Sequence, residues 1–280
     1  FGSRRERGVR SPGGSSAMAG DEGPDPSSRC SSKLSASLKQ QPQAKPKNEL
    51  LESIEVCRSG TATSEQCLAH CAVLEQATLR SSACHQKVLD ADVAGALVMA
   101  MANHMESPEV LTMACRAVQH LAASKAANAT RVAEAGCCAA ACAGMEAHPD
   151  NALVQQAACH ALELMAFGGA AARQRANEDG GPEAAVRAVK AHKGAVHLQQ
   201  AALAALQAMG SEGVEVRQRI AKNGAVTGAI SALAEHRDDH QVQYWGRLLL
   251  RDLCDASPDV RAEVTRKCHF QGIELDASGY

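Results

Sequence analysis

Aromatic residues are scarce in this 280-residue chain, which has one Trp, two Tyr and three Phe, or 2% of all residues. Hydrophobic residues nevertheless make up 45% of the sequence, and alanine is the commonest of them. Alanine is the best helix former, and its small side chain lets helices pack closely. We therefore expect an all-α protein whose core is built largely from small side chains.

Long apolar runs and common catalytic motifs are also missing. The longest uncharged apolar stretches, residues 93–102 and 135–145, are too short to span a bilayer. The sequence shows no nucleophile beside a base, no phosphate-binding glycine loop and no clustered catalytic carboxylates. We therefore expect a protein that is not an enzyme, needs no cofactor and does not bind a membrane.

Charge is distributed unevenly along the chain. Residues 1–47 carry nine Lys and Arg against four Asp and Glu, whereas residues 48–280 have a net charge of −7. The first segment is rich in Ser, Gly and Pro, so we expect a disordered basic tail; a localisation signal or a contact with an acidic surface is the alternative. The acidic remainder argues against nucleic-acid binding.

Twelve cysteines would suit a disulfide framework, but most of them fall within apolar helical stretches. A thiol in such a place acts as a small hydrophobic side chain. The chain also shows no secretory apolar segment. We therefore expect an intracellular protein, cytoplasmic or nuclear, with reduced thiols.

A histidine recurs every 44 residues, at His104, His148, His192 and His236. Small residues recur with the same spacing, and so do large apolar ones. The small column is Ala114, Ala158, Ala202 and Gly246, and one apolar column is Leu121, Met165, Met209 and Leu253. A spacing kept through four copies without insertion indicates a stacked repeat array.

Each copy contains three apolar segments with helical spacing. The first ends at Gly136, Gly180 or Gly224, with Cys268 as the exception, and the second leads to the histidine. The third begins three residues after the histidine, where Ser107, Asn151 and Asp239 are good N-caps and Ala195 is not. We divide the repeat domain, 48–280, into a degenerate copy 48–91, full copies 92–135, 136–179, 180–223 and 224–267, and a partial or capping copy 268–280.

Three helices in about 44 residues, with a glycine before the second and Val-Gln opening the third, resemble armadillo (ARM) repeats. The segment 148–156, HPDNALVQQ, is similar to a subclass of these repeats with an HPDNxxVQ signature. The resemblance covers residues 92–267 well and residues 48–91 loosely. It implies a right-handed α–α superhelix in which the third helices line a groove that binds extended peptides or partner proteins.

In the best-known peptide carriers of that family, each third helix presents a tryptophan and an asparagine. The positions matching the tryptophan are Arg116, His160, Ala204 and Leu248, and those matching the asparagine are His120, Leu164, Ala208 and Asp252. Neither residue type is kept. This argues against carriage of basic nuclear signals, although a transport-type adaptor stays an alternative.

Two further features of the third segments could face a partner. A row of glutamines could bind an extended backbone, or it could be a solvated helix start. Trp245 could fill core space beside Gly246, or it could anchor a partner, as exposed Trp and Tyr often do. The predicted groove residues are Arg116, His120, Gln155, Gln156, His160, Gln199, Gln200, Gln243, Tyr244, Trp245, Arg247 and Asp252.

The recurring histidine suits a helix C-terminus, where imidazole can bind free carbonyls, better than a metal site. A second candidate site combines thiols and imidazoles at Cys67, His70, Cys71, Cys84 and His85. These ligand types suit tetrahedral zinc, but the cluster has no CxxC pair and its spacing matches no common zinc finger. Core packing is favoured, and no metal site is predicted.

Together these features predict a non-catalytic scaffold or adaptor that binds another protein or an extended peptide along the third helices. We expect it to be a monomer or a component of a larger complex. The alternatives are a nuclear-transport-type adaptor and a cysteine-based zinc or thiol sensor.

Overall fold

The computed structural model describes residues 46–79 and 88–274, and every regular element within these ranges is helical. The predicted basic tail therefore lies outside the described residues, apart from Pro46 and Lys47, which begin the first described helix. Cys84 and His85 of the suggested cluster also lie outside them. No described helix has the length and apolar character that a membrane crossing requires.

The helices recur with the 44-residue period of the sequence. The second helices of the copies are α2 (Pro46–Arg58), α5 (Val93–Asn103), α8 (Cys137–Ala147), α11 (Gly181–Ala191) and α14 (Ala225–Glu235). The third helices are α3 (Ser64–Thr78), α6 (Pro108–Ala123), α9 (Ala152–Phe167), α12 (Val196–Gly210) and α15 (His240–Cys254). The short first helices are α7 (Ala126–Glu134), α10 (Ala170–Glu178) and α13 (Val214–Lys222), and α16 (Pro258–Gln271) continues their series.

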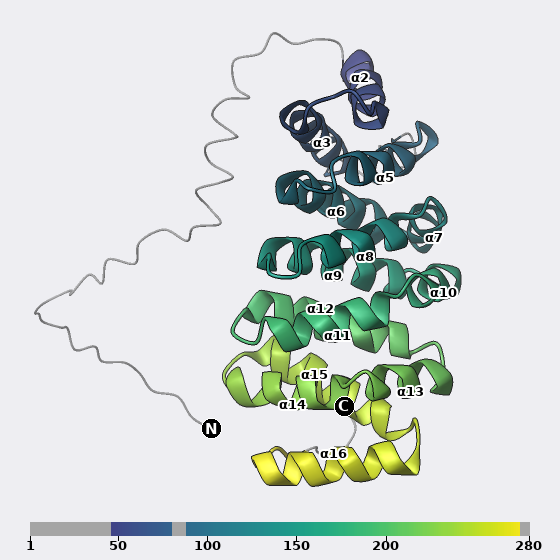
Figure 1. Ribbon diagram of the computed structural model, residues 1–280. Helices are drawn as coiled ribbons and strands as arrows, with labels where there is room; N and C mark the ends of the chain where they lie inside the picture. The colour runs from purple at the N-terminus through teal and green to yellow at the C-terminus, as the bar shows by residue number, and fades with distance from the viewer. Residues whose placement is uncertain (1–45, 80–87, 275–280) are drawn as a thin grey trace, which may run out of the picture. The chain divides into compact units, whose positions relative to one another are not determined.

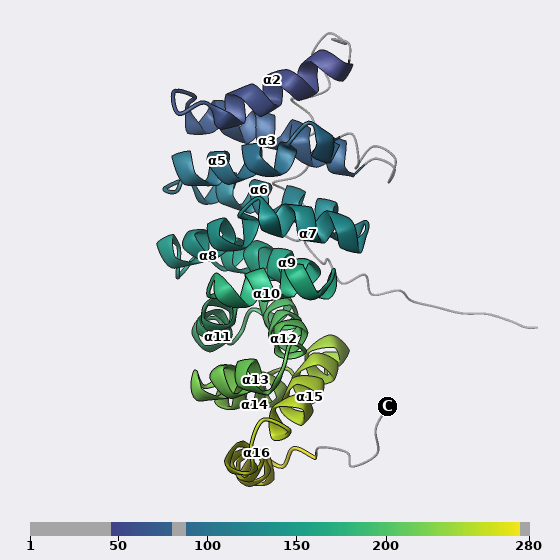
Figure 2. The same cartoon turned by 90° about the vertical axis from the view of Figure 1, so that its right-hand side faces the viewer.

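Each copy buries its apolar faces against the next one. Every third helix packs on the following third helix, and every second helix on the following second helix. The first helices α7, α10 and α13 follow one another along one side, and the third helices follow one another along the other (Figure 1). Within the described residues, the expected all-α, right-handed α–α superhelix is confirmed (Figure 2).

A residue with left-handed backbone conformation stands just before the second helices α5, α8, α11 and α14. Gly136, Gly180 and Gly224 have φ of 92°, 84° and 97°, a region that glycine adopts without steric cost. Asp92 holds the same place at φ 58°, where its carboxylate accepts the N–H of Gly95. Cys268 breaks this series, and α16 runs through that position until Gly272 ends it.

The third helices begin where the sequence predicts. Ser107, Asn151 and Asp239 accept backbone N–H groups through their side chains, whereas Ala195 makes no side-chain cap. The apolar column through Leu121, Met165, Met209 and Leu253 is fully buried. In the small column, a Cβ on Gly246 would lie 2.8 Å from Cδ2 of Leu233. Leu233, on the second helix of that copy, can pack this closely because Gly246 has no side chain.

Candidate functional site

The recurring histidines end the second helices and connect successive copies. Each stands at the C-cap, where its backbone N–H binds the carbonyl four residues earlier. In the last three copies the imidazole Nε2 donates to a carbonyl of the preceding copy. These bonds are His148 to Met105 at 2.8 Å, His192 to Pro149 at 2.7 Å and His236 to Lys193 at 2.6 Å. These histidines therefore have a structural role, as their position at a helix end suggests.

His104 departs from this pattern. Its Nδ1 lies 3.2 Å from Oγ of Ser64 in the preceding copy. The residue is buried, and its Nε2 has no hydrogen-bond partner among the described residues. A buried polar atom without a partner costs free energy, so this nitrogen needs an explanation that packing does not provide.

The glutamine that follows Val154, Leu198 or Val242 makes hydrogen bonds within its own copy. Gln155, Gln199 and Gln243 donate from Nε2 to two carbonyls at the end of the second helix. The acceptors are Met145 and His148, Val189 and His192, and Leu233 and His236, at 2.7 to 3.1 Å. These amides cap a helix end, which is neither of the two roles considered from the sequence.

Gln155 and Gln199 are also buried, so a partner could not reach them, and we leave both out of the candidate surface. Gln200 is half-buried and lies at the start of α12. Its amide donates to both carboxylate oxygens of Asp239, at 3.0 Å each. The N–H of Val242 and this amide lower the pKa of Asp239 below its usual value. Gln156 is half-buried on α9.

Arg116 and His120 on α6 face Glu75 on α3. Nε of Arg116 lies 2.8 Å from the Glu75 carboxylate, and Nε2 of His120 lies 3.8 Å from it. Glu75 is buried, which makes this an inter-copy ion pair in a partly desolvated place. These two groove candidates therefore hold neighbouring third helices together.

The other polar candidates are also tied to neighbours. Nδ1 of His160 lies 3.0 Å from the Glu163 carboxylate on the same helix. Asp252 accepts the Gln207 amide of α12 at 3.0 Å. Arg247 contacts the side chain of Gln243 and the backbone carbonyl of Glu274.

Three aromatic side chains meet near the C-terminal end of the third-helix row, and we call them the aromatic cluster: Phe167, Tyr244 and Trp245. The ring centroids of Phe167 and Trp245 are 5.8 Å apart, and those of Tyr244 and Trp245 are 4.9 Å apart in an edge-on arrangement. Phe167 is 47% exposed and Tyr244 50%. The cluster therefore combines half the aromatic residues of the chain and leaves much of the surface of Phe167 and Tyr244 in water, whereas Trp245 is half-buried against the core.

The small residues of α12 explain how the cluster forms. Trp245 is on α15 and Phe167 ends α9, two third helices earlier, with α12 between them in the stack. The position equivalent to Trp245 on α12 is Ala201, and Ala204 and Ala208 are also buried there. Side chains this small leave room for the indole to reach Phe167. The space beside Gly246 is taken by Leu233, so Trp245 does not fill it.

Sequence reasoning singled out Tyr244 and Trp245 but missed Phe167. The equivalent residues in other copies are Ala123, Ser211 and Asp255, so the repeat pattern gave Phe167 no role. Its signal was the rarity of aromatic residues in the chain.

Comparison with known proteins identifies similar folds among solved structures but no matching family or curated protein. No protein-family model matches the chain, and no curated protein matches it either. Among solved structures, it is similar to an engineered protein from the Northeast Structural Genomics Consortium, with a TM-score of 0.68 and 22% identity over 78% of this chain and 86% of that one.

Designed armadillo repeat proteins are similar as well. One, in complex with the peptide (KR)4, has a TM-score of 0.66 and 16% identity over 79% of this chain and 88% of that one. Another, computationally designed for modular peptide recognition, has a TM-score of 0.65 and 18% identity over 78% and 87% of the two chains. The described part of the chain therefore has the armadillo-type repeat fold that the sequence pattern resembles.

Proposed function

We propose that this protein is a non-catalytic scaffold that binds an extended segment of another protein along its third helices, centred on the aromatic cluster. The observation that carries the proposal is the cluster itself. Exposed Tyr and Trp side chains on a rigid support are common binding hot spots, because they bury much area at little entropic cost. The similar designed armadillo proteins, which recognise peptides, support the same general role.

The chemistry of the surface favours a ligand with an apolar or aromatic side chain. Phe167 and Tyr244 offer apolar area, whereas Arg116, His120, His160 and Asp252 are engaged with protein groups. A basic peptide such as the (KR)4 ligand of the designed protein would find neither the family's tryptophans nor its asparagines. Ala204 and Ala208, which match those two positions, are buried. This argues against a nuclear-transport-type adaptor.

The test is selection of peptides from a random displayed library on the full chain, followed by affinity measurement for single variants. We expect Trp245→Ala and Tyr244→Ala to weaken a selected peptide by about 30-fold, which corresponds to about 2 kcal/mol. The matched control is Phe270→Ala, because Phe270 is an exposed aromatic residue on α16, outside the third-helix row.

Thermal unfolding separates binding from folding in this experiment. Tyr244→Ala removes a half-exposed side chain and should leave the midpoint of unfolding close to that of the wild type. If selected peptides bind both cluster variants as tightly as they bind the control, the proposed surface is wrong. If they are uniformly basic, the transport-type alternative is favoured.

A further inference from the structure

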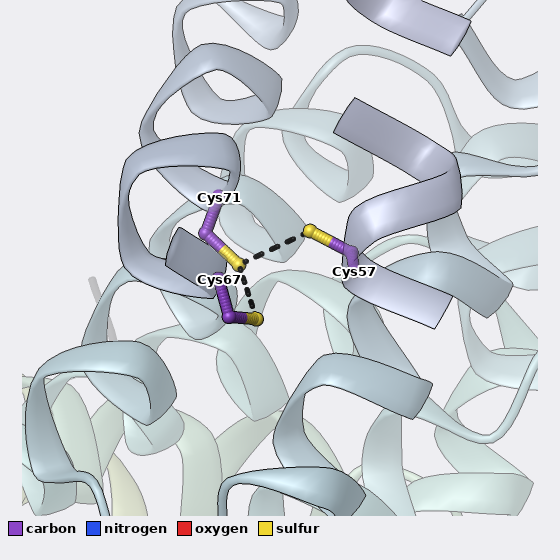
Figure 3. Close-up of side chains that lie close together, drawn as sticks. All are labelled: Cys57, Cys67 and Cys71. Carbon is purple, nitrogen blue, oxygen red and sulfur yellow. Dashed lines mark hydrogen bonds between the residues drawn. The ribbon is translucent and has the colours of Figure 1, made fainter. Parts of the chain in front are cut away.

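Three thiols meet inside the first described copy. Cys57 comes from α2, and Cys67 and Cys71 come from successive turns of α3. The Sγ atoms of Cys57 and Cys71 are 3.7 Å apart, those of Cys67 and Cys71 are 4.0 Å apart, and all three lie within 4.8 Å of one another. Figure 3 shows the sulfur of Cys71 between the other two. All three residues are fully buried.

These distances suit a single metal ion. With bonds of about 2.3 Å, as for zinc and thiolate, a tetrahedral ion holds its sulfur ligands about 3.8 Å apart. A three-coordinate ion in the plane of the sulfurs holds them about 4.0 Å apart at the same bond length. The observed separations between Cys71 and its two neighbours are of this size, so small side-chain movements would complete the site.

The next copy shows what packing alone needs at these places. The equivalent residues there are Met101, Leu111 and Cys115, all buried. Sγ of Cys115 lies 3.9 Å from Sδ of Met101, so the equivalent pair makes the same sulfur contact. Packing is thus satisfied with one thiol, a thioether and a leucine, and it does not require three thiols.

A second observation concerns the imidazole next to this copy. His104 is 5% exposed, and its Nε2 has no partner in the described part of the chain. Its Nδ1 is near Ser64, which lies on α3 one turn before Cys67. Metal-binding histidines commonly hold their second nitrogen in this way. His70 is occupied differently, because its Nδ1 lies 3.0 Å from Oγ of Ser53.

We propose that Cys57, Cys67 and Cys71 bind one thiophilic d10 cation, Zn²⁺ or Cu⁺, through three thiolates. Soft sulfur ligands select these ions. Cu⁺ would be held by the three sulfurs alone, whereas Zn²⁺ would need a fourth ligand, and the unpartnered Nε2 of His104 would have to move within bonding distance of the ion to supply it. Binding releases the protons of the coordinating thiols to solvent and changes no oxidation state. The site is separate from the aromatic cluster and does not depend on the proposed function.

The experiment titrates the full chain, reduced and freed of metal, under anaerobic conditions. Zn²⁺ is added against a chromophoric chelator, and Cu⁺ is added separately against a Cu⁺-specific chelator. Co²⁺ serves as a spectroscopic probe, because thiolate ligands give it charge-transfer absorption. We expect one equivalent of Zn²⁺ or Cu⁺ to bind to the wild type.

The main variant is Cys57→Met with Cys67→Leu, which places the residues of the next copy in the first one and so preserves packing. Its affinity should fall by more than about 100-fold, because lost ligands cost more than the 10- to 100-fold of outer-shell changes. The control is Cys159→Ala, which removes a buried thiol from the column of Cys71 and Cys115 in another copy. It should bind like the wild type.

His104→Ala separates the two ions, since it should weaken Zn²⁺ and leave Cu⁺ unchanged. The metal should raise the unfolding midpoint of the wild type and of Cys159→Ala, but not that of the double variant. If the wild type binds neither ion stoichiometrically, or if the double variant binds as well as the wild type, the proposal is wrong.

Discussion

The copies that span residues 136–267 differ from those that span residues 48–135. In the later copies a left-handed glycine, a C-terminal histidine and a buried or half-buried glutamine occur together and make the same bonds each time. In the copy before them, Asp92 replaces the glycine and Leu111 replaces the glutamine, while His104 binds Ser64 instead of a carbonyl. The helices stack alike in both regions.

The difference shows that the fold tolerates the loss of its polar links as long as the apolar columns remain. Where these hydrogen bonds are present, the polar side chains are engaged within the fold, as the buried amide of Gln199 is. Where they are absent, the same positions are free for other chemistry. Cys67 occupies the glutamine position in the first copy, and it takes part in the three-thiol cluster.

The largest effect should come from breaking a glutamine link. Gln199→Ala removes a buried amide that donates to Val189 and His192 at 2.9 and 2.8 Å, and it leaves two helix-end carbonyls without that donor. We expect a loss of about 3 kcal/mol in the free energy of unfolding. Urea denaturation measures it. His197→Ala on the same helix, where the side chain is exposed, should change it by less than about 0.5 kcal/mol, and equal losses would contradict the assigned role.

Breaking a histidine link should cost less. His192→Ala removes the 2.7 Å bond to the carbonyl of Pro149, which is exposed, so we expect a loss of about 1 kcal/mol. The matched change His192→Gln restores a donor near that carbonyl and should recover part of the loss. Urea denaturation of both variants measures these losses. An unchanged free energy of unfolding for His192→Ala would show that the bond contributes nothing to stability.

The left-handed residue offers a sharper comparison between the two regions. Gly136→Ala places a Cβ at φ 92°, where no atom lies within 4 Å, so only backbone strain of about 1 kcal/mol is expected. Gly136→Asp should lose less, because Asp92 accepts the N–H of Gly95 from the equivalent place. If the two variants unfold at the same denaturant concentration, the cap at Asp92 has no energetic value.

The smallest effect concerns pH. The pKa of Asp239 is lowered in the folded state, so the charged form favours folding above the unfolded pKa, and this contribution is lost as the pH falls through the folded pKa. The group is partly exposed, which keeps the effect small. Between about pH 5 and about pH 2, the wild type should lose slightly more stability than Asp239→Asn does. Parallel slopes for the two proteins would contradict this.

The sequence predicted the features that depend on period and on local capping. The columns through Leu121 and Met165 are buried, the third helices begin at Ser107 and Asn151, and the histidines end helices. These properties follow from residue type and spacing along one segment, so no knowledge of neighbouring copies was needed.

The candidate sites were predicted less well, because they depend on how side chains turn between copies. Cys57 falls in the same column as Met101 and looks like a core residue, yet its sulfur faces Cys71. Phe167 has no recurring counterpart, and its contact with Trp245 joins residues 78 positions apart. A period states which residues stack but does not say which way each side chain points.

The imidazole-to-carbonyl bonds of His148, His192 and His236 have a mechanical consequence. Each bond joins a copy only to the one before it, so tension applied along the stack is carried by these joints in series. A series yields at its weakest member. The joint at His104 lacks such a bond, and its load falls instead on the contact with Ser64 and on the buried ion pair between Arg116 and Glu75.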